Sequence, residues 1–483
     1  MEHLEDERNA VGRAVGETAS RQTETVRMAP LGELTAPKID QGGPVGTDDF
    51  AYVDISSVDN KLKRITEPKA LAAEAAPSRA KQRLKSGDVL VSMTRPNLNA
   101  VAIVPPELDG AVGSTGFYVL RANEGTEPRW LYYAVQTQDF VSAMSELVQG
   151  ALYPAVRPKD IRAFEIPHRP LDQQKRIVAE IEKQFSRLDE AVANLKRVKT
   201  NLKRYKAAVL KAAVEGRLVE TEAEIARREG RSYETGAQLL QRILETRRSQ
   251  WKGKGKYKEP AAPDTTDVPE LPEGWVWTSL DQLSDVVRGG SPRPAGDPRY
   301  FGGPVPWITV GLLTGDESDY LHRVPEGLTL EGKERSRYIE PDTLLLTNSG
   351  ATLGVPKISL IGGCINDGVA ALLGVEYPLK RYLVNFLRTK TMSMRRINQG
   401  ASQPNLNTSI IKAMVVPLPL EAEQHRIVAE VDRRLSLLSE TEAQVDANLQ
   451  RAEHLRQAVL ASAFRGQLER QGHNHGNRSK TTE

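Results

Sequence analysis

The heptapeptide KRIVAEI at residues 175–181 recurs as HRIVAEV at residues 425–431, 250 positions later. When the chain is aligned with itself at that offset, 23 of the 70 residue pairs between 149–218 and 399–468 are identical, and no gap is needed. Chance does not keep one register over such a length, and a long fixed period indicates a duplicated structural unit. The chain is therefore predicted to contain two copies of one unit.

The first half of each copy is repeated more loosely. The segment LGEL at residues 31–34 resembles LDQL at 280–283. The segment GDVLVSMTRPNLNAVAIV from residue 87 resembles PDTLLLTNSGATLGVPKI from residue 341. Because these matches need small shifts of register, each copy is predicted to have a divergent front and a better-matched back.

The back half of each copy is predicted to be one long helix. No proline or glycine occurs between Asp172 and Gly216, or between Glu421 and Gly466. Apolar residues recur in steps of three and four, which is typical of a coiled-coil seam. The predicted seam comprises Ile181, Phe185, Leu188, Leu195 and Leu202 in the first helix, and Val431, Leu435, Leu438, Val445 and Leu449 in the second; the same spacing includes Tyr205 and Leu455. Each helix is expected to stop at its glycine, which can adopt the left-handed C-terminal cap.

The two long helices are expected to pair with each other. A lone helix with one apolar stripe cannot bury that stripe in water. Residues 172–215 carry eleven Lys/Arg against six Asp/Glu, whereas residues 422–465 carry six against seven, and this difference favours pairing. The alternative is that each helix packs only on its own globular domain. The residues alone do not distinguish parallel from antiparallel pairing.

The remaining parts of each copy are predicted to be globular and of the α+β class. Short apolar strands lie between glycine and proline turns, for example DVLVSM, VAIV and FYVL in residues 28–171, and TLLLT and VAALLGV in residues 275–421. One helical stretch follows in each, WLYYAVQTQDFVSAMSELV from Trp130 and RYLVNFLRTKTMSMRRI from Arg381. The linker 219–274 begins helical and then becomes basic and proline-rich, which is typical of a domain boundary.

Composition limits the classes of protein that fit. Cys364 is the only cysteine, so no internal disulfide is possible, and a reducing cytoplasm is expected. No run of about 18 apolar residues occurs, so no membrane span is predicted. The net charge of +3 says little about partners. The segment RRSQWKGKGKYK at residues 247–258 has six basic residues and no acid, which fits either a solvated linker or a strap that contacts phosphates.

No catalytic motif is found. The chain has no phosphate-binding loop ending in Gly-Lys-Ser/Thr and no His/Cys spacing suited to zinc. The loop NSGATLG at residues 348–354 occupies the position that TRPNLNA at residues 94–100 occupies in the other copy. A loop whose position persists while its content changes fits recognition of two different targets better than shared chemistry.

A series of motifs in the second copy is similar to a known family. GWVWTSLDQLSDVVRGGSPRP is followed by VPWITVGLL, PDTLLLTNSGATLG, GCINDGVAAL and INQGASQPNLNTSIIKAMVVPLPLEAEQHRIV. This series resembles the target-recognition repeat of the specificity (S) subunit of type I restriction–modification enzymes, and the resemblance spans about residues 28–468. The first copy carries the pattern more loosely, as QGALYPAVRPKDIRAFEIPHRPLDQQKRIV, and departs from the family's usual polar loop at ALYPAVRPKD.

The resemblance implies an architecture of two target-recognition domains in tandem, each followed by a long helix, with the helices paired as an antiparallel coiled coil of pseudo-two-fold symmetry. The implied boundaries are residues 1–27 for a flexible tail, 28–171 for the first recognition domain, 172–218 for the first coiled-coil helix, 219–274 for the linker, 275–421 for the second domain, 422–468 for the second helix and 469–483 for a disordered tail. Each domain would read one half of a bipartite site on double-stranded DNA, and the coil would fix the spacing.

The resemblance also implies partners. Two modification (methyltransferase) subunits would dock on the coil and methylate adenine with S-adenosylmethionine. Two restriction subunits would translocate and cut DNA with ATP and Mg. The chain itself would carry no catalysis, cofactor or metal, and the assembly would act in the cytoplasm in phage defence.

Candidate DNA contacts follow from the chemistry of base edges, because Asn and Gln suit adenine, and Arg suits guanine. The candidates are Arg95, Asn97 and Asn99 in the first domain, Asn348, Ser349, Thr352, Gln403 and Asn405 in the second, and Arg288 and Arg293 for phosphates. Each is also the kind of residue that forms an ordinary turn. A stand-alone DNA-binding regulator and a coiled-coil adaptor without enzyme partners share the same architecture and stay open as alternatives.

Overall fold

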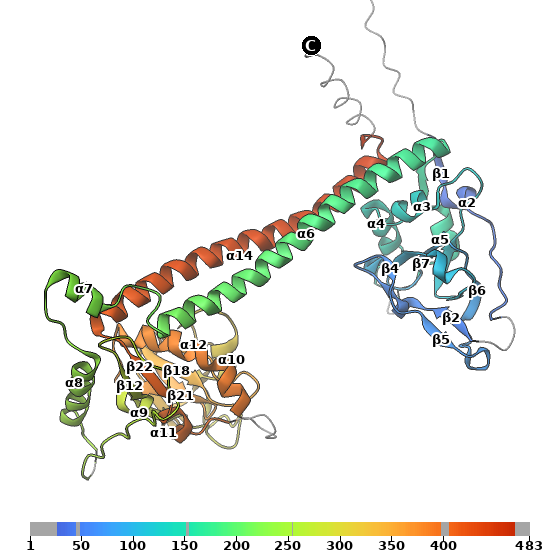
Figure 1. Cartoon of the computed structure of the whole chain (residues 1–483). Coiled ribbons are helices and arrows are strands. Elements are labelled where there is room, and N and C mark those ends of the chain that lie inside the picture. The colour runs from blue at the N-terminus through green and yellow to red at the C-terminus, as the bar shows by residue number, and fades with distance from the viewer. Residues whose placement is uncertain (1–26, 45–48, 151–153, 254, 398–404, 469–483) are drawn as a thin grey trace, which may run out of the picture. The chain divides into compact units, whose positions relative to one another are not determined.

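The computed structural model describes residues 27–44, 49–150, 154–253, 255–397 and 405–468. Contacts divide the chain into two compact units, one of residues 1–195 with 447–483 and the other of residues 196–446. Each unit holds one β-rich globular domain and a length of both long helices, α6 (Leu171–Val214) and α14 (Glu421–Phe464) (Figure 1). The predicted C-terminal tail and nearly all of the predicted N-terminal tail lie outside the described residues.

The globular domain of the first unit, named domain 1, contains two main sheets. Its strands are β1 (Met28–Pro30), β2 (Phe50–Val53), β3 (Val58–Asp59), β4 (Arg64–Ile65), β5 (Lys69–Leu71), β6 (Ala80–Arg83), β7 (Val89–Ser92), β8 (Val101–Ile103), β9 (Val112–Ser114), β10 (Phe117–Leu120) and β11 (Glu165–Pro167). Its helices are α2 (Leu31–Leu34), α3 (Pro128–Ala134), α4 (Gln138–Glu146) and α5 (Pro158–Ala163). The sheet orders are β10-β7-β8 and β5-β2-β9-β6, and β1 pairs with β11 just before α6 begins.

The globular domain of the second unit, named domain 2, follows a linker with helices α7 (Glu222–Glu229) and α8 (Gly236–Ser249). Its strands are β12 (Val276–Ser279), β13 (Asp285–Arg288), β14 (Phe301–Ile308), β15 (Tyr320–Leu321), β16 (Gly327–Leu328), β17 (Arg337–Ile339), β18 (Thr343–Thr347), β19 (Pro356–Ser359), β20 (Gly363–Ile365), β21 (Val369–Leu373) and β22 (Val415–Leu418). Its helices are α9 (Leu280–Leu283), α10 (Val310–Thr314), α11 (Leu330–Glu334), α12 (Leu379–Ile397) and α13 (Thr408–Lys412). The sheet orders are β13-β21-β18-β19-β15 and β16-β14-β20-β17, with β12 paired to β22.

The two domains share the pairing of their central strands, and domain 2 has β13 and β15 as additional strands at the edges of its larger sheet. In domain 1, β2 runs parallel to β9, and β5 and β6 flank that pair in antiparallel fashion; β14, β20, β16 and β17 repeat the arrangement in domain 2. In domain 1, β7 lies between β10 and β8 and is antiparallel to both. In domain 2, β18 lies in the same way between β21 and β19. The LGEL and LDQL segments form the matching helices α2 and α9. The duplication is therefore confirmed even in the front halves, where sequence identity fades.

One predicted helix of domain 1 is wrong. The stretch from Trp130 to Val148 is two helices, α3 and α4, and not one. The Thr137 hydroxyl accepts a hydrogen bond from the Phe140 backbone N–H, which makes Thr137 the N-cap of a new helix. The equivalent stretch in domain 2 forms the single helix α12, as predicted.

Each long helix starts and stops in the same way. Buried Gln174 and Gln424 each donate a side-chain hydrogen bond to the carbonyl group five residues earlier, at 2.7 Å and 2.9 Å. This bond satisfies a carbonyl group at the turn into the helix and explains why the Gln precedes the repeated heptapeptide. Each helix ends two residues before a glycine of positive φ, 68° at Gly216 and 74° at Gly466, as predicted.

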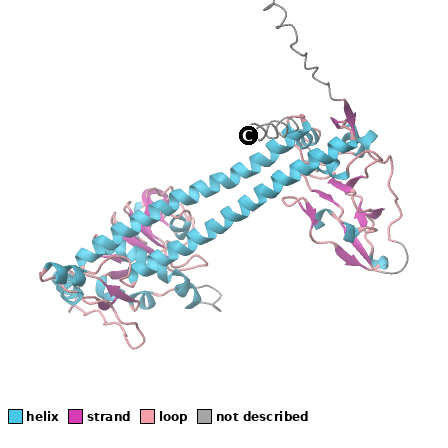
Figure 2. Ribbon diagram, turned by 45° about the horizontal axis from the view of Figure 1, so that its top comes forward, coloured by secondary structure: helices cyan, strands magenta, loops and turns pink. Residues whose placement is uncertain are grey.

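Within each unit, a length of α6 and a length of α14 run alongside each other (Figure 2). In the first unit, Asp189 of α6 forms an ion pair with Arg456 of α14. In the second unit, Lys199 Nζ of α6 lies 2.6 Å from Asp446 Oδ1 of α14. In the same unit, Arg434 of α14 donates a hydrogen bond to the hydroxyl of Tyr205 of α6, so residue numbers rise along α6 as they fall along α14, and the pairing within this unit is antiparallel.

The residues of the predicted seam are all buried or half-buried, and part of this burial comes from the domain cores, which include Ile181 and Phe185 in domain 1 and Val431 in domain 2. Ile181, Phe185, Val431, Leu438 and Val445 are buried, and Leu188, Leu195, Leu202, Leu435 and Leu449 are half-buried. Tyr205 and Leu455 were predicted to belong to the same stripe, but they are 47% and 45% exposed. Tyr205 nevertheless contacts the partner helix at its edge, because its hydroxyl accepts a hydrogen bond from Arg434 of α14 at 3.4 Å.

Each domain forms its hydrophobic core with both long helices. The core of domain 1 includes Ile177 and Ile181 from the start of α6, and Leu460 and Ala463 from the end of α14. The Trp130 ring of α3 stacks on Phe464 of α14, with centroids 4.2 Å apart. The core of domain 2 has the reciprocal composition, with the start of α14 and the end of α6.

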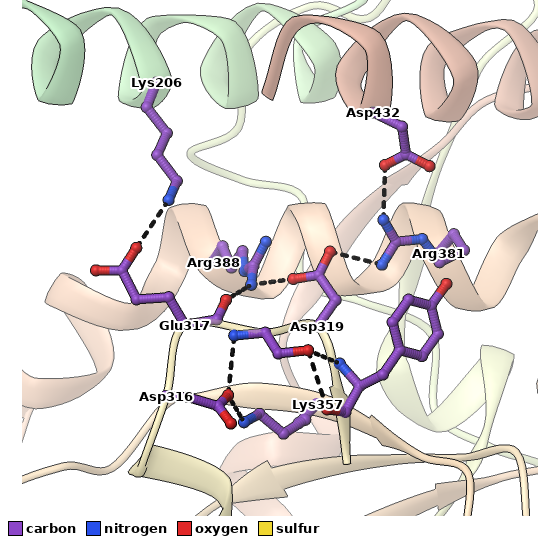
Figure 3. A network of polar contacts seen from close by, with 10 residues as sticks. Lys206, Asp316, Glu317, Asp319, Lys357, Arg381, Arg388 and Asp432 are labelled. Atoms are coloured by element: carbon purple, nitrogen blue, oxygen red, sulfur yellow. Dashed lines mark hydrogen bonds and ion pairs between the residues drawn. The ribbon is translucent and has the colours of Figure 1, made fainter. Parts of the chain in front are cut away.

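An arginine joins each domain to the first part of its own long helix. In domain 2, Arg381 of α12 lies 2.7 Å from the Asp319 carboxylate and 2.6 Å from that of Asp432 on α14 (Figure 3). In domain 1, Arg129 of α3 forms an ion pair with Glu182 of α6. Asp432 and Glu182 are separated by the repeat offset of 250 residues. The two arginines differ in burial, since the Arg381 side chain is 8% exposed and that of Arg129 is 54% exposed.

We expect Arg381→Met to lower the free energy of unfolding by about 1–3 kcal/mol, because it removes a buried cation from both Asp319 and Asp432 and leaves the poorly solvated Asp319 with Arg388 as its remaining partner. The matched substitution Arg129→Met should cost less than about 1 kcal/mol, because that ion pair is solvated. Urea denaturation followed by circular dichroism measures both values. Equal losses for the two variants would contradict the role assigned to the burial of Arg381.

Candidate nucleic-acid interface

In domain 1, two loops that are distant in sequence meet at the end of β7. The Arg95 backbone N–H donates a hydrogen bond to the Pro154 carbonyl at 2.9 Å, and the Val156 N–H donates to the Met93 carbonyl at 2.8 Å. These bonds hold the TRPNLNA loop against the segment that precedes α5. The domain therefore presents a composite surface made of two loops on a rigid sheet.

Domain 2 builds the same surface at the equivalent place. The Leu406 backbone N–H donates to the Asn348 carbonyl at 2.7 Å, which repeats the bond between Val156 and Met93 of domain 1. An antiparallel bridge joins Ser349 to Asn405. The loop NSGATLG thus lies against the segment that precedes α13. The backbone frame is common to both domains, whereas the side chains on it differ.

The domain 1 loop has a backbone that fixes its exposed side chains. Arg95 and Asn99 have positive φ angles, 49° and 45°, on either side of the short turn Pro96–Leu98. The Arg95 and Asn97 side chains are exposed, and that of Asn99 is half-buried. Lys63 Nζ donates to the Asn99 carbonyl at 2.5 Å, and burial lowers the pKa of Lys63 to about 8. The Lys63 contact was not predicted, because Lys63 lies 36 residues away in the sequence.

In domain 2 the structure exposes Thr352 and Asn405 and leaves Ser349 half-buried. The Thr347 hydroxyl donates to the Thr352 carbonyl at 2.9 Å and accepts from the Val355 N–H at 2.9 Å, which closes the loop. Thr352 is therefore held at the surface by the end of β18. Gln403 lies outside the described residues.

The expectation for Asn348 has to be corrected. Its side chain is fully buried, and neither amide atom has a hydrogen-bond partner within the part of the chain that the structure describes. Its backbone N–H donates to the Gly368 carbonyl at 2.9 Å, which draws the residue into the domain. Asn348 therefore supports the loop from beneath and does not present its amide to a duplex.

Arg288 and Arg293 both contact the turn that contains Asp367. Arg288 Nε donates to the Asp367 carbonyl at 2.7 Å, and an Arg293 guanidinium nitrogen lies 3.6 Å from the Asp367 carboxylate. Both arginines are exposed, and the Arg293 side chain is 73% exposed. The same turn contacts Asn348 through Gly368, so these cations lie at the same end of domain 2 as the two loops.

Two further groups anchor the domain 2 loop from α12. The Thr391 hydroxyl donates to the Gly354 carbonyl at 2.7 Å, and Arg395 Nε donates to the Leu353 carbonyl at 3.1 Å. The sequence pattern predicts these residues only as part of a helix, and it does not predict their contacts with the loop. The basic character of α12 is the signal that could have identified them.

The described residues carry no group of three or more His, Cys, Asp or Glu side chains placed to hold a metal ion. Among the same residues, no helix is both long and apolar enough to cross a membrane. The features that the geometry does offer are exposed polar and cationic side chains on paired loops. Such groups suit contacts with base edges and phosphates.

Comparison with known sequences identifies relatives. Residues 272–451 match the family model of the type I restriction modification DNA specificity domain. The EcoBI specificity subunit of Escherichia coli is 25% identical over 352 residues, which are 70% of this chain and 65% of that protein. The StySPI specificity subunit of Salmonella potsdam is 23% identical over 444 residues, 89% of this chain and 80% of that protein. The MjaIX specificity subunit of Methanocaldococcus jannaschii is 30% identical over 165 residues, 34% of this chain and 38% of that protein. The matches to the MjaIX and EcoBI subunits thus span less than two thirds of those proteins.

Comparison with solved structures extends the likeness over most of the chain. A chain from a study of complex assembly and conformational transition in the type I R-M system superposes with a TM-score of 0.67 at 26% identity, covering 91% of this chain and 98% of that chain. The HsdS subunit of Thermoanaerobacter tengcongensis gives a TM-score of 0.52 at 26% identity, covering 93% and 99%. Residues 272–451 thus match the type I restriction modification DNA specificity domain, and most of the chain resembles specificity subunits of type I restriction–modification enzymes in sequence and in fold.

Proposed function

We propose that this chain is the DNA sequence-recognition subunit of a type I restriction–modification complex. Domain 1 reads one half of a bipartite site on duplex DNA, and domain 2 reads the other half. The coiled coil of α6 and α14 sets the spacing between the half-sites and docks the methyltransferase subunits. The chain contributes recognition, and catalysis is left to the partner subunits.

One observation carries the proposal: the same pair of loops, tied by the same backbone hydrogen bond, ends the central sheet of both domains while its exposed side chains differ. In domain 1 these side chains include Arg95 and Asn97, and in domain 2 they include Thr352 and Asn405. Hydrogen-bonding side chains of different identity read different base edges in the major groove. Two such readers on a common frame suit a site with two unlike halves.

The chemistry of the system is assigned to partners. Two modification subunits bind S-adenosylmethionine and methylate adenine at N6, and two restriction subunits use ATP and Mg to translocate and cut DNA. These assignments rest on the family, whose members are named as subunits of type I restriction enzymes. Two alternatives, a stand-alone DNA-binding regulator and a coiled-coil adaptor, differ in leaving no methylation mark.

The decisive experiment is methylome sequencing of a host with and without this chain. We expect N6-methyladenine at a split site with two short specific halves and a fixed gap, which disappears when the gene is deleted. Co-purification of methyltransferase subunits with the tagged chain separates the complex from a stand-alone regulator. An unchanged methylome would overturn the proposal.

Substitutions in the paired loops should alter one half-site at a time. We expect Asn97→Ala to relax base preference in only one half of the site and Asn405→Ala to relax it in only the other half. The loss of one base contact should reduce discrimination at that base pair by about 1–3 kcal/mol. Binding to libraries of duplexes with single base changes measures the effect.

The matched control for both variants is Gln241→Ala. Gln241 is exposed on α8, and among the described residues its side chain bonds to Glu245 alone, so its removal should leave both half-sites unchanged. If Asn97→Ala and Asn405→Ala altered the same half-site, the assignment of one half to each domain would be wrong.

Lengthening the coil should lengthen the gap. Lys199 and Asp446 face each other, so a heptad inserted after each residue extends both helices at matched positions. Each helix gains about 10 Å, which corresponds to about three base pairs at roughly 3.4 Å per pair. Methylome sequencing should therefore show a gap longer by up to about three base pairs. Seven residues inserted after Ala262, in the linker, should leave the gap unchanged; a constant gap in both variants would rule out the coil as a ruler.

A further inference from the structure

A basic cleft lies in the second unit between α6, α12 and the turn that follows β18. Its volume is about 510 Å³. Four cations line it: Lys203 and Lys206 from α6, and Arg388 and Arg395 from α12. The hydroxyl-bearing residues Thr352 and Thr391 also line it, and so do the carboxylates of Asp316 and Glu317. Thr352 belongs to the candidate recognition loop, so the cleft adjoins the surface proposed to read DNA.

Two carboxylates at or near the cleft, Asp316 and Asp319, are already paired with cations, one of which is the lining residue Arg388. Lys357, which is 1% exposed, lies 2.6 Å from the Asp316 carboxylate and lowers its pKa (Figure 3). Asp319 forms ion pairs with Arg381 and Arg388. Because Asp316 and Asp319 are already paired with these cations, they repel an incoming anion less strongly.

Glu317 is the one carboxylate that faces a lining cation from the solvent side. Its side chain is 90% exposed, and its Oε2 lies 3.3 Å from Lys206 Nζ. An exposed ion pair of this kind is weak and readily exchanged. Neither Lys203 nor the terminal nitrogens of Arg395 have an ionic partner among the residues that the structure describes. The cleft therefore keeps a surplus of positive charge and contains a cation whose present anion is loosely held.

The sequence around α12 points the same way. Residues 377–420 contain seven Lys/Arg and no Asp or Glu. The equivalent positions of the other copy do not reproduce the cleft, because Lys203 corresponds to Glu453 at the repeat offset, and Lys206 corresponds to Arg456, which is paired with Asp189. The surplus of cations occurs in the second copy of the fold and is not reproduced in the first, so the fold itself does not require it.

We propose that this cleft binds a backbone phosphate of the duplex, with Lys203 and Lys206 of the coil as the phosphate ligands and Arg395 at its rim. A duplex that contacts the loop containing Thr352 brings its phosphates alongside the cleft, and Lys and Arg are the usual phosphate ligands. The contact sets register and adds affinity without reading sequence. This inference rests on the proposed function, since it assigns a second role to the coil at that same DNA surface.

The test is the salt dependence of binding to a duplex that carries the methylated site, measured with the complete chain and its modification subunits. Each phosphate contact contributes about 0.9 to the slope of log affinity against log salt concentration. We expect the double substitution Lys203→Gln with Lys206→Gln to make the slope shallower by about 1 to 2. The affinity for specific and for random duplexes should fall by the same factor.

Two matched variants separate phosphate binding from a structural role. Lys211→Gln removes a charge from the same helix outside the cleft and should leave the slope unchanged. Glu317→Gln removes the carboxylate that competes for Lys206 and should tighten DNA binding, a gain that loss of structure would not produce.

Each outcome bears on a different claim. If the wild-type complex binds the duplex and the double variant keeps its slope, the cleft is not a phosphate site, and the proposed function stands. If the double variant instead loses its modification subunits with DNA binding unaffected, the cleft is a protein-docking surface, and the inference is overturned. If the wild-type complex shows no salt-dependent duplex binding, the proposed function and this inference both fail.

Discussion

The structure depends on one constraint: each globular domain needs the final turns of the long helix from the other copy to complete its core. Leu460 and Ala463 of α14 are buried in domain 1, and Val209 and Ala213 of α6 are buried in domain 2. Burying a large apolar side chain contributes about 1.5–3 kcal/mol, so releasing either helix end would be costly. A helix that starts in one core and ends in the other can pair with its equivalent only in antiparallel fashion.

This constraint applies to the residues that build the cores and the helix pairing, and not to the residues exposed on the loops. The pairing of the central strands, the starts of the long helices and one backbone hydrogen bond between the two loops are the same in both domains, because they serve packing. The residues displayed on the loops are under no such demand, and Arg95 with Asn97 in one domain can differ from Thr352 with Asn405 in the other. A single architecture can therefore present two unlike recognition surfaces.

Electrostatics distinguish the two halves more than their folds do. Domain 2 is joined to α14 through Arg381, whose buried guanidinium bridges Asp319 and Asp432. The equivalent Arg129 of domain 1 is exposed and forms an ion pair with Glu182 of α6. Domain 2 also carries the surplus of cations along α12. When one of two similar domains is more basic, that domain can contribute more of the sequence-independent affinity for a polyanionic ligand.

The sequence by itself determined the features that depend on local periodicity and register. These are the duplication, the two long helices and their glycine ends, most of the seam, and the positions of the paired loops. Tertiary structure alone decided the direction of helix pairing, because an apolar stripe has the same spacing in either direction. It also buried Asn348 and joined Asp319, Arg381 and Asp432. Each of these outcomes arises from contacts between segments distant in sequence, and such contacts leave no periodic mark on the chain.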